Sequence, residues 1–149
     1  MRNCSSSEPI RYLDVSEQAV IALLRRQIDS PVLMLNLLHF RDVADYSATP
    51  ALAPNPPISG KEAYTLYIAH SKPFLSASGG EILLLGDGGQ FLIGPQSENW
   101  DWVMLIKQQS LQDFLAFANN SDYLAGIAHR QAALQDSRLL PISPTYLRD

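Results

Sequence analysis

The chain has 149 residues, of which 46% are hydrophobic and 17% charged, and its formal net charge is −4. This composition is typical of a compact soluble protein, and the length predicts one domain over residues 1–149. The acidic balance, with no basic cluster beyond Arg25 and Arg26, argues against a nucleic-acid-binding protein.

Cysteine content and apolar runs indicate the compartment. Cys4 is the single cysteine, so no intramolecular disulfide can form, which favours a reducing compartment. Residues 1–10 contain no apolar segment typical of a signal peptide, and no apolar run reaches membrane-spanning length. We therefore expect a cytoplasmic protein without membrane contact.

Residues 1–30 form a predicted helical extension. Asp14 and Glu17 can cap a helix whose apolar residues, from Val20 to Ile28, share one side. We expect this helix to pack on the outside of the core. The alternative is that it reaches across to a partner subunit.

Residues 31–40 are the first predicted core strand. The run from Val32 to Leu35 is apolar at every position, as in a strand that is covered on both faces. Alternation places Asn36 on one face and His39 on the other, and a register shift of one residue would exchange the two faces.

Residues 41–58 contain four prolines and form a predicted irregular loop. A loop of this length is either a flap over one end of the sheet or a surface insertion. Ser59 and Glu62 then form a capping box for a helix that Pro73 is expected to end or kink.

The glycine cluster over residues 86–89 follows an apolar strand over residues 81–85. Glycines adopt the positive φ angles of tight turns, so the cluster predicts a hairpin whose second strand is residues 90–93. A phosphate-binding loop is the alternative, but no Lys-Ser or Lys-Thr pair follows the glycines.

The stretch over residues 100–141 predicts a strand, two helices and a strand. Residues 102–106 are the apolar strand, and Ser110 and Ser121 stand where helix N-caps belong. Residues 137–140 return as the last strand.

Several patches of the sequence carry a resemblance through their order and spacing. They are PVLMLNLLHFRD (31–42), SGKEAYTLYIAHSKPFLSASGGEILLLG (59–86), LIGP (92–95), WDWVMLIKQQSLQDFLAFANNSDY (100–123) and HRQAALQDSRLL (129–140). Over residues 31–140 the chain resembles a family of uncharacterised small proteins in the dimeric α+β barrel superfamily. The resemblance implies a ferredoxin-like βαββαβ domain that dimerises sheet to sheet, and it implies no established activity.

The expected fold is therefore α+β, with a four-stranded antiparallel sheet, helices on one face, an extra N-terminal helix and an extra hairpin strand. Helices on one face leave the other, apolar face in need of cover. We expect a second copy of the chain to supply that cover, in a homodimer formed through the sheet face.

His39 is the candidate catalytic residue. It ends an apolar strand, and a histidine can act as an acid or a base near neutral pH. The alternative is a half-buried polar group without a chemical role.

Three residues can bind a ligand in a pocket between the sheet and the helices: Asn36, Tyr64 and Tyr67. A buried Asn36 needs hydrogen-bond partners, which are either a ligand or the backbone of a neighbouring strand. The tyrosines can equally be core residues with a polar tip.

Tyr123 and Arg130 are two further candidates for ligand binding. They are seven residues apart and share one face of the second predicted helix. Arg130 in an Ala-rich helix can anchor an anionic ligand, or it can pair with an acid such as Asp101 or Asp136. The resemblance picks out Tyr123 and Arg130 without assigning them a role.

No metal or cofactor is expected, because the three histidines lack the spacing of metal ligands and no HExxH, CxxC or GxSxG motif is present. Two functions stay open. One is a cofactor-independent enzyme that acts on a small anionic or aromatic molecule in the pocket between sheet and helices. The other is a non-catalytic small-molecule-binding or structural homodimer. A second titratable group beside His39 would favour the enzyme.

Overall fold

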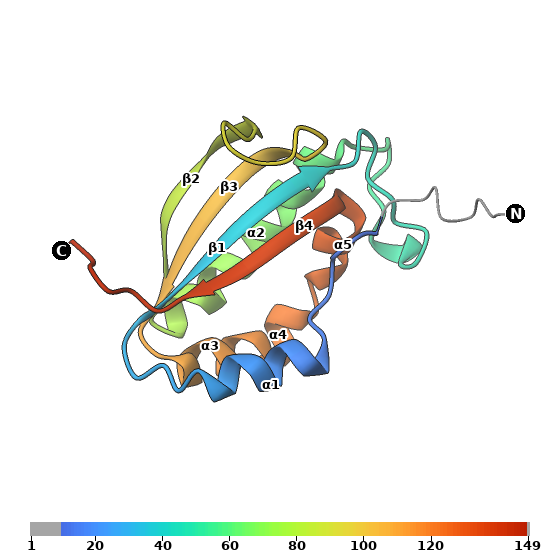
Figure 1. Ribbon diagram of the computed structural model, residues 1–149. Coiled ribbons are helices and arrows are strands. Elements are labelled where there is room, and N and C mark those ends of the chain that lie inside the picture. Colours follow the sequence, from blue (N-terminus) through green and yellow to red (C-terminus); the bar gives the residue numbers. More distant parts are fainter. Residues whose placement is uncertain (1–9, 149) are drawn as a thin grey trace, which may run out of the picture.

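The computed structural model describes residues 10–148, and its centre is a four-stranded antiparallel sheet (Figure 1). Cys4 lies outside the described residues. The strands follow the order β2-β3-β1-β4 and are β1 (Val32–Phe40), β2 (Glu81–Gln90), β3 (Asn99–Gln108) and β4 (Leu134–Ile142).

The helices lie on one side of this sheet (Figure 1). They are α1 (Glu17–Arg25), α2 (Gly60–Ala77), α3 (Leu111–Ala118), α4 (Ser121–Leu124) and α5 (Ile127–Ala133), with a short 3-10 helix, η2 (Pro50–Leu52), in the Pro-rich loop. The element order from β1 to β4, together with the strand order, confirms the expected ferredoxin-like βαββαβ fold. Among residues 10–148, no helix combines the length and the hydrophobicity needed to cross a membrane.

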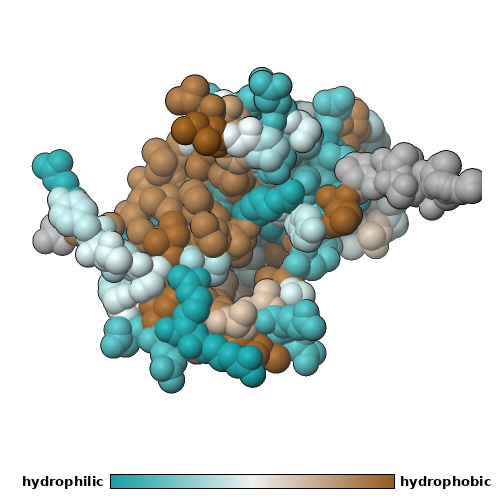
Figure 2. All heavy atoms as spheres, in the orientation of Figure 1, coloured by the Kyte–Doolittle hydropathy of each residue, from teal (hydrophilic) through white to brown (hydrophobic). Residues whose placement is uncertain are grey.

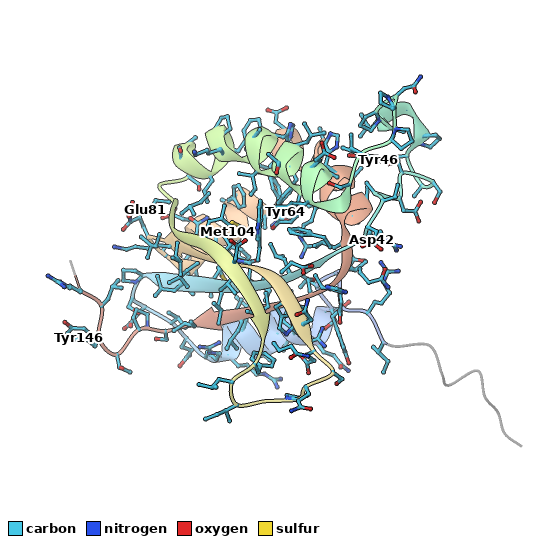
Figure 3. The ribbon with its side chains drawn as sticks, turned by 90° about the horizontal axis from the view of Figure 1, so that it is seen from above. Asp42, Tyr46, Tyr64, Glu81, Met104 and Tyr146 are labelled. Atoms are coloured by element: carbon cyan, nitrogen blue, oxygen red, sulfur yellow. The ribbon has the colours of Figure 1, made fainter. Side chains whose placement is uncertain are left out.

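The core lies between the sheet and the helices. Even-numbered side chains of β1 face this side: Leu38 belongs to the larger core cluster, and Val32 and Met34 belong to a smaller one. Tyr64 of α2 and Met104 of β3 are in the larger cluster and lie between α2 and the sheet (Figure 3). Each large apolar side chain buried here stabilises the fold by roughly 1.5–3 kcal/mol.

Helix α1 begins after Ser16 and not at Asp14. The Ser16 hydroxyl accepts a hydrogen bond from the Ala19 N–H at 3.1 Å, so a nearer serine supplies the cap. No residue of α1 is fully buried, and Leu23 packs against the smaller core cluster. The helix therefore packs on the outside of the core, beside α3 (Figure 1), as expected.

Helix α2 begins with the predicted capping box. The Ser59 hydroxyl accepts from the Glu62 N–H at 3.0 Å, and the Glu62 carboxylate accepts from the Ser59 N–H at 2.9 Å. Pro73 does not end this helix, which continues to Ala77. A proline removes one intrahelical hydrogen bond; burial of Leu75 in the next turn helps to hold the helix together.

The extra hairpin strand predicted over residues 90–93 is absent, because the sheet of the described chain has four strands. The glycines from Gly86 to Gly89 lie inside β2, and the turn to β3 follows at residues 91–98. At position 88 the backbone requires glycine, since a Cβ atom there would collide with the carbonyl oxygen of Trp100. Gly88 thus permits close strand packing, whereas a Cβ atom at Gly86 or Gly89 would meet nothing within 4 Å.

The helix predicted after Ser121 is divided into α4 and α5. Gly126 lies between the two, and a Cβ atom at this position would collide with the ring of His70. Asn120 caps α4, because its side-chain oxygen accepts from the Asp122 and Tyr123 N–H groups at 2.8 and 3.1 Å.

The sheet face turned away from the helices is apolar (Figure 2). In the strand register, Leu35 lies between Leu105 of β3 and Leu140 of β4, and Leu84 of β2 lies opposite Leu105. Leu84 and Leu140 are 54% and 57% exposed. We call this surface the open face, and its members are Leu35, Leu37, Leu84, Val103, Leu105 and Leu140.

Candidate functional site

His39 lies at the end of β1 on the same side of the sheet as the open face, beside Asp101 of β3. The His39 Nδ1 and Asp101 Oδ2 atoms are 3.0 Å apart, and the two side chains are 38% and 35% exposed. Because a carboxylate only accepts hydrogen bonds, Nδ1 carries the proton of a neutral imidazole. The lone pair is then left on Nε2, which is where a general base needs it.

Asp101 is held in position by two further donors. The Phe40 N–H donates to Oδ2 at 2.8 Å, and the Asn99 side-chain amide donates to Oδ1 at 3.2 Å. A carboxylate that is fixed in this way fixes the orientation of the imidazole ring as well. The pair therefore has the arrangement by which an aspartate orients a histidine base.

A cleft of about 430 Å³ lies beside this pair, which is within the size range of small-molecule sites. It is formed where β1 ends, β3 begins and α2 begins. Its lining residues are Phe40, Arg41, Asp42, Ser59, Lys61, Asp87, Asp101 and Trp102. Asp101 thus belongs both to the histidine pair and to the wall of the cleft.

The cleft combines cations with an aromatic wall. The Lys61 ammonium group lies 5.3 Å from the centre of the Trp102 ring, and the Phe40 and Trp102 rings meet edge to face at 5.1 Å. Arg41 Nε is buried and has no hydrogen-bond partner among the described residues. Arg41 and Lys61 give the cleft two cations, and Asp42, Asp87 and Asp101 give it three carboxylates.

Tyr64, Tyr67 and Tyr123 form a buried cluster between the sheet and the helices. The hydroxyl groups of Tyr67 and Tyr123 are 2.6 Å apart, and the rings of Tyr64 and Tyr67 are 5.1 Å apart. Burial raises the pKa of Tyr64 and of Tyr123, and neighbouring Tyr67 raises both further, so these phenols stay protonated. Aromatic rings thus occupy the space where the sequence predicted a pocket.

Arg130 of α5 is beside this cluster. Its guanidinium group donates to the Leu13 carbonyl oxygen at 2.6 Å and to the Ser137 hydroxyl at 3.4 Å. It also lies near the Tyr64 hydroxyl, where its charge partly offsets the effect of burial on the pKa of Tyr64. Both hydrogen-bond partners are neutral groups, and Arg130 connects the N-terminal segment to β4 instead of pairing with Asp101 or Asp136.

Asn36 faces the helices and is 8% exposed. Its side-chain amide donates to the carbonyl oxygens of Met34 and Met104 at 3.2 and 3.5 Å. Both partners belong to strand backbones. The buried Asn36 amide is therefore hydrogen-bonded within the sheet, without a ligand.

The Pro-rich loop folds beside α5 and the start of α2 (Figure 1). Its Tyr46 hydroxyl lies 2.7 Å from His129 Nδ1, and its Asp45 N–H donates to the Ala132 carbonyl oxygen at 2.9 Å. Burial lowers the pKa of His129, and neighbouring His70 lowers it further, so the imidazole is kept neutral and can accept from Tyr46. A second cavity, of about 300 Å³, is lined by residues of this loop between Ala44 and Ile58.

The six predicted site residues thus fall into two groups. Tyr64, Tyr67, Tyr123 and Arg130 come together in the helix-side core with Asn36 on the adjacent strand, whereas His39 is on the other side of the sheet. Sequence reasoning missed that Asp101 partners His39 and that Arg41 and Lys61 line the cleft beside them. The available signal was the antiparallel pairing of β1 with β3, which sets Leu38 opposite Trp102 and hence position 39 near position 101.

Within residues 10–148, no three or more His, Cys, Asp or Glu side chains gather where they could hold a metal ion.

The fold and a substantial part of the sequence match a solved protein. Two crystal structures of the RPA0582 protein, a protein of unknown function from Rhodopseudomonas palustris, are 32% identical to this chain. One match covers 93% of this chain and 100% of that chain, with a TM-score of 0.77. The match to the methylated form covers 91% of this chain and 96% of that chain, with a TM-score of 0.78. This chain belongs to the family of the RPA0582 protein.

The RPA0582 family match confirms the expected membership in a group of uncharacterised proteins. A dimeric ferredoxin-like protein of unknown function from Thermobifida fusca is more distant, at 16% identity, 77% and 92% coverage of the two chains and a TM-score of 0.46. No family model and no curated protein matches the chain.

Proposed function

We propose that this protein is a homodimeric enzyme that moves a proton on a small anionic substrate, with His39 as the general base. The observation that carries the proposal is the 3.0 Å contact between His39 Nδ1 and Asp101 Oδ2, since Asp101 also lines the cleft beside the histidine. A titratable partner beside His39 favours an enzyme over a passive binding site.

The chemistry follows from the groups around the cleft. His39 Nε2 accepts a proton from an acidic C–H group next to a substrate carbonyl, and the electron pair moves to the carbonyl oxygen to give an enolate. Return of a proton to the same carbon gives exchange with solvent, and its delivery to the enolate oxygen gives the enol tautomer. Asp101 orients the imidazole and stabilises its positive charge, and Lys61 and Arg41 attract a substrate carboxylate.

Hydrogen–deuterium exchange of small keto acids in D₂O tests this activity. With pyruvate, phenylpyruvate and levulinate as probes, we expect faster loss of the C–H proton signal of at least one acid in the presence of the protein. His39→Gln should slow that exchange by about 10²–10⁴-fold, the usual contribution of a general base. Asp101→Asn should slow it less, because it removes only the orienting group.

His70→Gln is the matched control. His70 lies on α2, and its Nε2 atom is 2.8 Å from the Asp122 carbonyl oxygen, a contact that a glutamine amide can replace. This variant should leave the exchange rate unchanged. Exchange at the wild-type rate in His39→Gln would overturn the catalytic role.

The homodimer is proposed from the open face. Its leucines form a contiguous apolar surface over the strands (Figure 2), and such a surface on a small protein marks an interaction site. In a two-fold dimer the same patch of each copy meets its counterpart, so one self-complementary face suffices. The apolar character of Leu35 and its neighbours supports this mode of assembly.

A non-catalytic homodimer is the second candidate. It is favoured by the aromatic packing of Tyr64, Tyr67 and Tyr123, which fills the space between sheet and helices. For such a protein, none of the keto acids would exchange faster, and none would shift the NMR signals of the Trp102 indole. A shift of those signals without exchange would indicate a binding protein.

A further inference from the structure

The turn between β2 and β3 exposes two large apolar side chains at its apex. Leu92 is 100% exposed and Ile93 is 93% exposed, and the preceding Phe91 is 37% exposed. We call residues 91–93 the hairpin tip. Isolated apolar residues on a surface are ordinary, but two adjacent ones at almost full exposure on a protruding turn point to a contact with another surface.

The hairpin tip is held in shape by contacts within the turn. The Phe91 ring packs against Gly94, where a Cβ atom would lie 2.8 Å from the ring and where φ is +156°. The Gln90 side-chain amide donates to the Gln96 carbonyl oxygen at 3.2 Å and closes the base of the turn. Leu92 and Ile93 are therefore presented on an ordered turn, which lowers the entropy lost when they bind.

The hairpin also points toward the place where a second copy would lie. Seen from above, the far ends of β2 and β3 bend away from α2, so the tip projects from the side of the sheet that carries the open face (Figure 3). Leu84, lower on the same strand β2, is a member of the open face. The apolar surface thus continues along β2 toward the tip (Figure 2).

The charges around the tip disfavour an anionic membrane as its partner. From Pro73 to Ile106 the chain contains no Lys or Arg, and it carries four acids, Glu81, Asp87, Glu98 and Asp101; Arg138 of β4 reaches this segment, 4.0 Å from the Glu98 carboxylate. Membrane-binding segments normally combine apolar side chains with basic ones, because lipid surfaces are negative. A neutral, apolar protein surface fits the tip better.

We propose that the hairpin tip is a dimerisation arm, in which Leu92 and Ile93 pack against the second copy of the chain beyond the edge of the open face. This inference rests on the proposed homodimer and adds to it. The open face supplies the contact between the two sheets. The arm of each copy packs against the other copy and lowers the dissociation constant of the dimer.

Sedimentation velocity over a micromolar dilution series tests the arm on the full chain. Replacing Leu92 and Ile93 together by Gln should raise the dimer dissociation constant about tenfold or more, because two apolar side chains per copy lose their contact. Leu66→Gln is the control, since Leu66 is 42% exposed on α2, away from the open face, and it should leave the dissociation constant unchanged. Circular dichroism and the melting temperature at low protein concentration show whether each variant is folded.

The outcomes separate the arm from the dimer itself. A wild-type protein that is monomeric throughout the series overturns the dimer and the arm together. A wild-type dimer whose dissociation constant does not change in the Leu92→Gln, Ile93→Gln variant overturns the arm and leaves the dimer standing. Sedimentation of the wild-type protein, but not of this variant, with phosphatidylcholine–phosphatidylglycerol vesicles would assign the tip to a membrane and overturn the arm as well.

Discussion

The hydroxyl groups of Tyr67 and Tyr123 are 2.6 Å apart in the core, and each is the hydrogen-bond partner of the other. Replacing one tyrosine by phenylalanine leaves the opposite buried hydroxyl without that partner. We expect Tyr67→Phe and Tyr123→Phe each to lower the free energy of unfolding by about 1–3 kcal/mol, as measured by urea denaturation.

The double variant Tyr67→Phe, Tyr123→Phe shows whether the two hydroxyl groups stabilise the protein through their mutual hydrogen bond or independently. It removes both hydroxyl groups, so no unpaired donor stays in the core, and its cost should be clearly smaller than the sum of the two single costs. Additive single and double costs would show that the two hydroxyls do not interact.

The two glycines Gly86 and Gly88 of β2 offer a test of the strand that replaced the predicted turn. A Cβ atom at position 88 would collide with the Trp100 backbone, whereas one at position 86 would meet nothing within 4 Å. Gly88→Ala should cost about 1–3 kcal/mol of stability through overpacking. Gly86→Ala should be neutral or stabilising by up to about 1 kcal/mol, because it restricts the unfolded chain.

Thermal or urea unfolding of these two matched variants checks the prediction. If residues 86–89 formed a turn at the end of the hairpin, both alanines would be tolerated or both would be disruptive. A difference in the stated direction therefore supports the extended β2 strand.

The contact between Tyr46 and His129 makes stability depend on pH. Burial, and then the neighbouring His70, lower the pKa of His129 in the folded protein below its value of about 6.5 in an unfolded chain. The unfolded state therefore takes up a proton first as the pH falls. The stability from neutral His129 is fully present above about pH 6.5 and is lost as the pH falls through the lower, folded-state pKa.

Urea denaturation at several pH values between about 5 and 8 checks this dependence. In the wild type the free energy of unfolding should fall toward acid pH more steeply than in His129→Gln, which cannot titrate. Parallel curves for the two proteins would exclude a role for His129. Tyr46→Phe, which removes the donor to Nδ1, should weaken the attachment of the Pro-rich loop at neutral pH.

The tautomer of His39 is a direct consequence of its contact with Asp101. We expect long-range ¹H–¹⁵N NMR spectra at pH 8 to show the proton on Nδ1 and the lone pair on Nε2. Asp101→Asn should reduce this preference, because its amide can no longer act only as an acceptor. A predominant Nε2–H tautomer in the wild type would remove the basis for His39 as a base.

Local patterns in the sequence predicted most of the fold. The Ser59–Glu62 capping box and the Ser110 cap involve residues three positions apart, and both form as expected. The alternation of side chains along β1 correctly placed Asn36 and His39 on opposite faces of the sheet. Helix caps and strand alternation depend only on backbone geometry within one element, so they can be predicted without knowledge of the tertiary structure.

The features that could not be predicted depend on which elements meet. Gly86–Gly89 has the composition of a turn, but pairing with β3 keeps it extended, since tertiary contacts override local preference. The partner of His39 is 62 residues away, and only the strand register brings it near. Arg130 likewise binds the Leu13 carbonyl, 117 residues away, in place of the acids that were expected.

The molar mass of the native protein in solution tests the central claim, that a second copy covers the open face. Light scattering after size-exclusion chromatography at micromolar concentration should give twice the 16.5 kDa of one chain. Leu35→Lys, which puts a charge in the middle of that face, should give the mass of a single folded chain. A wild-type mass of one chain would contradict the account.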